Sequence, residues 1–177
     1  MRVAINGFGR IGRITMRALL KKQGIEVVAI NDLTDVKTLA HLFKYDSVHR
    51  QFDGTVEAGV DEIKFNGTAV KVFAERNPEN LPWNDLQVDL VIEATGLFRT
   101  RESASGHLRA GAKQVVISAQ AKDKDIPSVV LGVNEDQVDF SAEIISNASC
   151  TTNCAAPMVK VLEDAVHVES IFVSTIH

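Results

Sequence analysis

The chain has little cysteine, and its few thiols do not suggest a secreted domain held together by disulfide bonds. Only two of its 177 residues are cysteine, at positions 150 and 154. Two cysteines so close together make a poor disulfide framework for a protein of this size, whereas a thiol kept free is typical of a reducing compartment. We therefore expect a cytoplasmic protein.

Long apolar runs and clusters of one charge are also missing. No stretch approaches the roughly 20 apolar residues that a membrane-spanning helix needs, and the N-terminus "MRVAING" predicts a short strand and a turn, not a secretory signal. The net charge is −4, without a long run of lysine or arginine. We expect neither a nucleic acid nor a membrane as partner.

What remains is an ordinary globular composition, with 45% hydrophobic and 24% charged residues, in a chain long enough for one domain and part of a second. Short β-branched runs alternate with amphipathic segments. Strands are predicted at 2–5, 26–30, 88–95, 113–118, 128–133 and 143–147, and helices at 10–22, after Thr34 or Asp35, and at 101–110. Ile11, Ile14, Ala18 and Leu19 should share one face of the first helix.

The pair Asn66-Gly67, between two alternating segments, predicts an antiparallel hairpin. The other predicted strands are buried and joined by helices. This pattern favours an α/β fold with a doubly wound, mainly parallel sheet that is covered on both faces and carries the hairpin as an insertion.

The first strand runs directly into "NGFGRIGR", in which Gly7, Gly9 and Gly12 have the spacing G-x-G-x-x-G. In a strand–turn–helix context this spacing predicts a dinucleotide site. The first glycine permits the tight turn, the second lets the backbone approach a pyrophosphate, and the third lets the helix pack on the sheet. The N–H groups of Arg10 and Ile11, at the positive end of the helix, should then face the anion. A glycine-rich turn without a ligand is the alternative.

An acidic residue is expected about 20 residues further on, at the end of the second strand, to bind the adenosine ribose. Asp32 occupies that position. Its carboxylate would repel a 2′-phosphate, so the sequence favours NAD over NADP. The alternative is that Asp32 caps the following helix.

Cys150 follows a predicted buried strand and begins a segment with helical apolar spacing. With Ser149 as the helix cap, the thiol lies in the first turn, where the helix dipole favours the nucleophilic thiolate. We expect Cys154, one turn later, to be a small buried hydrophobic residue. A metal site between the two cysteines is a third interpretation, but no cluster of further ligands is nearby, and we predict no metal.

His177 ends the β-like run "ESIFVSTIH". A histidine at a strand end can meet a helix start across a cleft and form a thiol–imidazole pair, or it can be an ordinary strand-terminal histidine. The remaining histidines are expected to be solvated or structural: His41, His49, His107 and His167.

At these residues the chain resembles the phosphorylating glyceraldehyde-3-phosphate dehydrogenase family over essentially its whole length. The matching segments are "INGFGRIGR", "NDLTD", "LFKYDSVH", "ATGLF", "GAKQVVIS", "SNASCTTNC" and the terminal "TIH". The resemblance implies a Rossmann-type NAD-binding domain over residues 1–148, and at 149–177 the first helix and strand of a catalytic α+β domain.

The resemblance also implies roles for individual residues. Cys150 would attack the aldehyde to give a thiohemiacetal and then a thioester, and His177 would activate the thiol. Ser149 and Thr151 would contact the substrate or phosphate. The residues implied to contact NAD, besides Gly7, Gly9 and Gly12, are Arg10, Ile11, Asp32, Arg76, Thr95, Phe98 and Ser118. From the residues alone, Arg76 could instead be held by Glu75 or Glu79, Ser118 could simply end a strand, and Phe98 could be core.

The implied activity is NAD-dependent oxidation of glyceraldehyde 3-phosphate with inorganic phosphate to 1,3-bisphosphoglycerate, in glycolysis, by a cytoplasmic homotetramer. A dehydrogenase of erythrose 4-phosphate is the alternative within the class. The 177 residues alone are expected to bind NAD weakly without turnover, because the groups that hold the substrate phosphates in this family follow the catalytic histidine. A non-enzymatic interaction protein on the same fold has no positive feature in the sequence.

Overall fold

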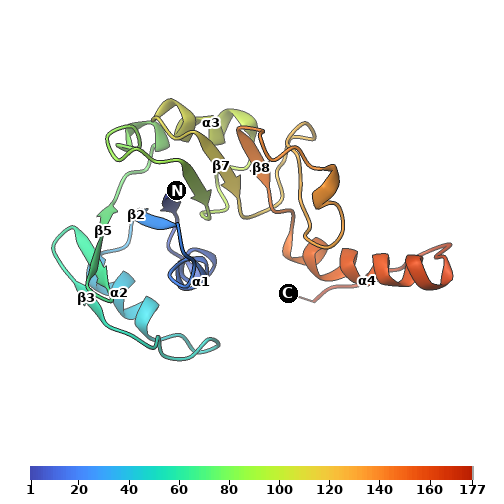
Figure 1. Cartoon of the computed structure of the whole chain (residues 1–177), viewed down its shortest axis with the longest axis horizontal. Helices are drawn as coiled ribbons and strands as arrows, with labels where there is room; N and C mark the ends of the chain where they lie inside the picture. The colour runs from blue at the N-terminus through green and yellow to red at the C-terminus, as the bar shows by residue number, and fades with distance from the viewer. Residues whose placement is uncertain (177) are drawn as a thin grey trace.

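The computed structural model describes residues 1–176, in which helices pack on both faces of one mixed sheet (Figure 1). The strands are β1 (Arg2–Asn6), β2 (Glu26–Asn31), β3 (Val56–Ala58), β4 (Glu62–Phe65), β5 (Thr68–Phe73), β6 (Leu90–Glu93), β7 (Gln114–Ile117) and β8 (Ile144–Ser146). The α-helices are α1 (Arg10–Leu19), α2 (Val36–Lys44), α3 (Arg101–Arg109) and α4 (Cys150–Val166), and short 3₁₀ helices span Pro78–Asn80 and Glu135–Gln137.

The strand order confirms the predicted fold class. Within the described residues the sheet runs β3-β4-β5-β2-β1-β6-β7-β8. The six strands β5-β2-β1-β6-β7-β8 are parallel, and their order is that of a doubly wound dinucleotide-binding fold. Since the carboxyl ends of parallel strands meet at one edge, the loops that follow β1, β2, β5, β6 and β7 gather there.

The predicted hairpin is present as β4 and β5, which pair in antiparallel register. Asn66 and Gly67 connect them with φ angles of 52° and 83°. Both central residues of a type I′ turn need positive φ, and Asn-Gly meets this requirement at low cost. The hairpin and β3 extend the sheet beyond its parallel part.

Two hydrophobic clusters lie on opposite faces of the sheet. The first joins α3 to β6 and β7 and includes Trp83, Val91, Ala104, Val115 and Ile117. The second joins α1 and α2 to β1, β2 and the hairpin and includes Phe8, Met16, Ile30, Phe43 and Phe65. Burial of this apolar surface is the main favourable contribution to folding.

Helix α1 is shorter than predicted and buries a different face. It ends at Leu19, and its fully buried residues are Gly12 and Met16. Ile11, predicted to face the core, is 51% exposed. Gly12, the next residue, packs against the Gly7 carbonyl oxygen, so the buried face of the helix contains Gly12 and Met16 and not Ile11.

The strand predicted at 128–133 is wrong in most of its length. Ser128 makes one isolated bridge to Ser146, and residues 131–133 form a turn. Gly132 has a φ of +80°, which an extended strand does not use. Apolar composition alone could not distinguish this turn, in which Leu131 is 71% exposed, from a strand.

The helix predicted after the cysteine segment is α4, which projects away from the sheet (Figure 1). The strand predicted before His177 is absent over the described residues 168–176, where no neighbouring segment provides the hydrogen-bond partners that a strand needs. His177 itself lies outside the described residues. None of the helices described is both long enough and apolar enough to cross a bilayer.

Candidate functional site

The glycine-rich turn after β1 has the geometry that each glycine predicts. Gly7 has a φ of +91°, and a Cβ atom there would lie 2.7 Å from the backbone nitrogen of Thr95. A Cβ on Gly12 would lie 2.1 Å from the carbonyl oxygen of Gly7. Gly9 has no atom within 4 Å of its Cβ position. The turn is therefore closed at Gly7 and Gly12 and open at Gly9.

The start of α1 can accept an anion. Gly9 is the N-cap residue, and no side chain supplies a cap hydrogen bond to the first amides of the helix. The first N–H groups of any helix have no partner within it, and they carry the positive end of the helix dipole. An anionic group in the open space at Gly9 would meet these amides, among them those of Arg10 and Ile11.

Asp32 is fixed beside this turn. One carboxylate oxygen accepts a hydrogen bond from the Phe8 backbone N–H at 2.7 Å, and the other accepts from the Thr34 N–H at 3.0 Å. The cap of α2 is Asp35, whose carboxylate accepts from the Thr38 N–H at 3.0 Å. The alternative in which Asp32 caps that helix is therefore wrong, and its ribose role stays a prediction.

A cavity of about 160 Å³ brings together five of the residues predicted to contact the cofactor. We call it the adenosine cavity. Its lining contains Gly7, Asp32, Arg76, Thr95 and Phe98 from the prediction, together with Asn6, Asn31, Leu33, Glu75 and Leu97. Asn6 and Asn31 end β1 and β2, and the other residues come from the loops after β1, β2, β5 and β6, so the sheet topology is what assembles them.

Contacts in the structure test the alternative interpretations of Arg76 and Phe98 as purely structural residues. The Glu75 carboxylate accepts from the Asn77 N–H at 2.9 Å, which holds the pKa of Glu75 below its ordinary value, and Glu79 pairs with Arg109. Within the described residues neither acid forms an ion pair with Arg76, which is exposed. Phe98 is half-buried and its ring packs edge-on against the buried His107 ring, which agrees with the alternative of a core role.

Cys150 is the first residue of α4, as predicted. The Ser149 hydroxyl accepts from the Thr152 N–H at 3.0 Å and caps the helix. The Asn153 side chain donates to the carbonyl oxygens of Asn147, at 2.7 Å, and Ser149, at 3.0 Å. These bonds hold the turn that presents the thiol, and Cys150 is exposed.

Cys154 is exposed as well, which contradicts the prediction of a buried residue. The prediction assumed that α4 packs against the sheet along its length. The helix instead extends away from the sheet, so that Met158, Val161 and Leu162 are also more than half exposed. The helical apolar spacing was correct, but within the described residues nothing covers that face.

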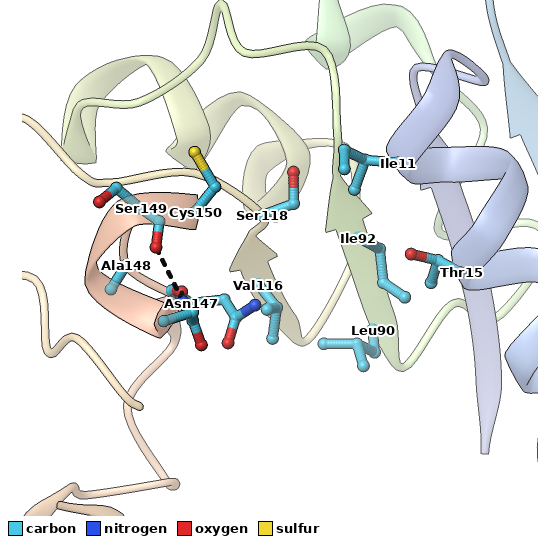
Figure 2. Close-up of a pocket in the computed structure, with 11 residues that line it drawn as sticks. Ile11, Thr15, Leu90, Ile92, Val116, Ser118, Asn147, Ala148, Ser149 and Cys150 are labelled. Carbon is cyan, nitrogen blue, oxygen red and sulfur yellow. Dashed lines mark hydrogen bonds between the residues drawn. The ribbon is translucent and has the colours of Figure 1, made fainter. Parts of the chain in front are cut away.

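A second cavity, of about 500 Å³, lies between α1 and the start of α4, and we call it the thiol cavity (Figure 2). Cys150, Ser149 and Ser118 line one side, Ile11 and Thr15 the other, and Leu90, Ile92 and Val116 form an apolar floor on the sheet. The nucleophile candidate and the first turn of α1 thus share one space. Arg10 and Thr151 are not part of the lining of either cavity.

Four buried polar residues at or below the floor of the adenosine cavity were not singled out from the sequence: Asn6, Asn31, Glu93 and His107. Their side chains are hydrogen-bonded to one another. The sequence did contain a signal for three of them, because Asn6, Asn31 and Glu93 are polar residues that end the apolar strands β1, β2 and β6. No group of three or more metal-ligating side chains occurs among the described residues.

Comparisons with known proteins agree with this geometry. Residues 1–101 match the family model described as glyceraldehyde 3-phosphate dehydrogenase, NAD binding domain, and residues 149–177 match the model of its C-terminal domain. The cofactor prediction, NAD, is thereby confirmed. The predicted boundary at residue 148 stays a prediction.

Relatives named glyceraldehyde-3-phosphate dehydrogenase align with nearly the whole chain. The identity is 55% over 176 residues for the protein of Clostridium acetobutylicum, 57% over 178 residues for that of Thermotoga maritima and 54% over 178 residues for that of Geobacillus stearothermophilus. The alignments cover 99%, 99% and 100% of this chain and 52%, 53% and 53% of these relatives. The chain therefore spans about half the length of the curated relatives it matches.

Proposed function

Because this chain belongs to the glyceraldehyde 3-phosphate dehydrogenase family, we propose that it supplies the cofactor site and the nucleophile of an NAD-dependent phosphorylating aldehyde dehydrogenase. The substrate is glyceraldehyde 3-phosphate, inorganic phosphate is the second substrate, and the product is 1,3-bisphosphoglycerate. Turnover is assigned to a protein of the relatives' full length, called the full-length protein below. The observation that carries the proposal is the thiol cavity, which Cys150 shares with the first turn of α1.

The described residues fit NAD. The pyrophosphate would lie at the open position beside Gly9, where the first amides of α1 lack cap partners. The adenosine would enter the adenosine cavity, where Asp32 presents its carboxylate and Thr95 and Phe98 form a wall. Ser118 would lie towards the nicotinamide, since it lines the thiol cavity with Cys150. When bound there, NAD accepts a hydride from the reacting carbon.

The exposed Cys150 sulfur would attack the aldehyde carbon and form a carbon–sulfur bond, giving a thiohemiacetal. The start of α4 supports this step in two ways. Its dipole favours the anionic sulfur, and the Cys150 backbone N–H can donate to the developing oxyanion. Loss of hydride leaves a thioester, and attack by phosphate on its carbonyl carbon releases the acyl phosphate and restores the thiolate.

Neighbouring residues would orient the reactants. Ser149 and Thr151 flank the sulfur, and we propose that they contact the substrate or the attacking phosphate. His177 would take the proton from the thiol, a role that follows from the family resemblance. We further propose a cytoplasmic homotetramer. The exposed apolar side chains of α4 and of residues 171–176 support packing against further polypeptide.

The test is NADH formation from glyceraldehyde 3-phosphate by the full-length protein. Rapid turnover should require inorganic phosphate. Cys150→Ser should lower kcat by at least about a thousandfold, because an alcohol is a far weaker nucleophile at neutral pH. Cys154→Ser is the matched control, one helical turn away and also exposed, and should keep most of the activity. Phosphate-independent turnover, or equal losses in the two variants, would contradict the proposal.

A further inference from the structure

A continuous group of buried polar side chains lies directly beneath the adenosine cavity. Trp83 and His107 are 0% exposed, and Asn6 and Glu93 are 1% exposed. Polar groups withdrawn from water this completely are costly unless each one has a hydrogen-bond partner. Here every one of the four has a side-chain partner among the others.

The hydrogen bonds fix which ring nitrogen of His107 carries the proton. The Trp83 indole N–H donates to Nδ1 of His107 at 3.0 Å. An indole nitrogen is a donor only, so Nδ1 must present its lone pair. The ring proton therefore lies on Nε2, which donates to a carboxylate oxygen of Glu93 at 3.0 Å.

Glu93 connects His107 by hydrogen bonds to the loop that forms one wall of the adenosine cavity. Its Oε2 accepts from His107 and also from the Asn6 side-chain amide at 2.5 Å. Its Oε1 accepts from the backbone N–H of Thr95 at 2.8 Å and from the Thr95 hydroxyl. The Leu97 N–H in turn donates to the Thr95 hydroxyl oxygen at 3.0 Å.

The same group reaches the opposite wall. The Asn31 side-chain amide donates to Oδ1 of Asn6 at 2.7 Å. Asn31 also donates to the carbonyl oxygen of Glu75 and accepts from its N–H, both at 2.8 Å. Glu75 directly precedes Arg76, so both walls of the adenosine cavity are tied to one buried network.

We propose that His107, held as the Nε2–H tautomer by Trp83, is a positioning residue for NAD that acts through Glu93 on the loop Thr95–Phe98. The ring also supports that loop by packing, since the Phe98 ring meets the His107 ring edge-on at a centroid distance of 6.2 Å. The proposal rests on the proposed function, which identifies the ligand of this cavity. His107 touches neither the substrate nor the reacting atoms.

An isosteric substitution separates this role from simple packing. Glu93→Gln keeps the shape of the side chain but introduces an amide N–H₂ where the carboxylate accepts from four donor groups of three residues, Asn6, Thr95 and His107. In one orientation the amide N–H₂ faces the donors of His107 and Asn6, and in the other it faces the Thr95 N–H. His107 cannot become an acceptor at Nε2, because the Trp83 N–H requires the lone pair on Nδ1 and the ring proton must stay on Nε2. Trp83→Phe removes that restriction. The His107 ring can then carry its proton on Nδ1 and accept at Nε2 from the amide of Glu93→Gln.

The experiment measures the Kd of NAD by calorimetry for the full-length protein and three variants. Glu93→Gln should raise Kd about tenfold and Trp83→Phe about threefold, as expected for one disrupted buried hydrogen bond and for one lost partner. The double variant should bind NAD more tightly than Glu93→Gln alone. Additive losses in the double variant, or an unchanged Kd in Glu93→Gln, would overturn the proposal.

A control and an NMR measurement keep the test independent of folding defects. Ile63→Val, a core change in β4 and in the hydrophobic cluster that does not contain Trp83, should leave Kd within about twofold. In the wild-type protein without cofactor, ring ¹⁵N shifts should show the His107 proton on Nε2, and a proton on Nδ1 would overturn the proposal. A wild-type protein that shows this tautomer but does not bind NAD would instead overturn the proposed function, and with it the ligand named here.

Discussion

At the scale of single residues, Gly9 and Gly12 occupy one turn and tolerate an added methyl group very differently. The Cβ position of Gly9 is open and its φ of −70° suits any residue, whereas a Cβ on Gly12 would collide with the Gly7 carbonyl oxygen at 2.1 Å. The Cβ position is set by the helix backbone and the oxygen belongs to the backbone of the turn, so neither atom can move away cheaply.

We therefore predict opposite outcomes for two matched variants. Gly12→Ala should lower the free energy of unfolding by about 2–3 kcal/mol, the usual cost of an overpacked contact. Gly9→Ala should change it by less than about 0.5 kcal/mol but weaken NAD binding about tenfold, because the methyl group fills the proposed pyrophosphate position. Urea unfolding and calorimetry measure the two quantities. A Gly9→Ala variant with unchanged NAD affinity would contradict the assignment of that space.

Residue patterns predicted the local geometry of the candidate site residues better than they predicted which side chains are buried. The glycine spacing, the Asp32 position and the cap at Ser149 depend on local sequence, and each has the expected local geometry. The exposure of Cys154 and the burial of His107 depend on what packs against α4 and α3. Those tertiary contacts have no local signature, so the sequence could not reveal them.

At the scale of elements, the start of α2 provides a titratable cap. The Thr38 hydroxyl and the Thr38 backbone N–H both donate to the Asp35 carboxylate and hold the pKa of Asp35 below its ordinary value of 3.8. A carboxyl whose pKa is lower in the folded state stabilises the fold above its unfolded pKa. That contribution is lost as the pH falls through the folded value.

Asp35→Ala should therefore be less stable than the wild type at pH 7, and the difference should shrink as the pH falls below about 4. Asp35→Asn is the matched control, because an asparagine oxygen can still accept from the Thr38 N–H but does not titrate. Urea unfolding at several pH values measures both variants. A stability difference for Asp35→Ala that stays constant down to pH 2–3 would show that the charged cap contributes nothing.

Elements bounded by residues with strong turn preferences were predicted well, and elements defined only by apolar content were not. Asn66-Gly67 specifies its turn through the φ angles that these residues allow, and the hairpin is present. The apolar run 128–133 is mostly a turn, and the run before His177 forms no strand in the described residues. Periodicity also placed Ile11 on the buried face of α1, because helical spacing does not say which side meets the sheet.

At the scale of the whole molecule, the strand order decides where the site forms. The loops that follow the six parallel strands gather at one edge of the sheet. The adenosine cavity lies among the ends of β1 and β2 and the loops after β1, β2, β5 and β6, and the thiol cavity lies between α1 and the start of α4. This arrangement was predictable, since buried strands alternating with helices admit few right-handed topologies. The separation of α4 from the sheet was not predictable, because it depends on contacts outside any local pattern.

The central claim is that the Cys150 sulfur carries the acyl group during turnover. The most direct measurement mixes the full-length protein with NAD and glyceraldehyde 3-phosphate without inorganic phosphate, quenches in acid and locates the adduct by peptide mass spectrometry. We predict one acyl group on Cys150, formed together with one NADH and removed when phosphate is added before the quench. NADH formation with Cys150 unmodified, or with the acyl group on Cys154, would contradict the account.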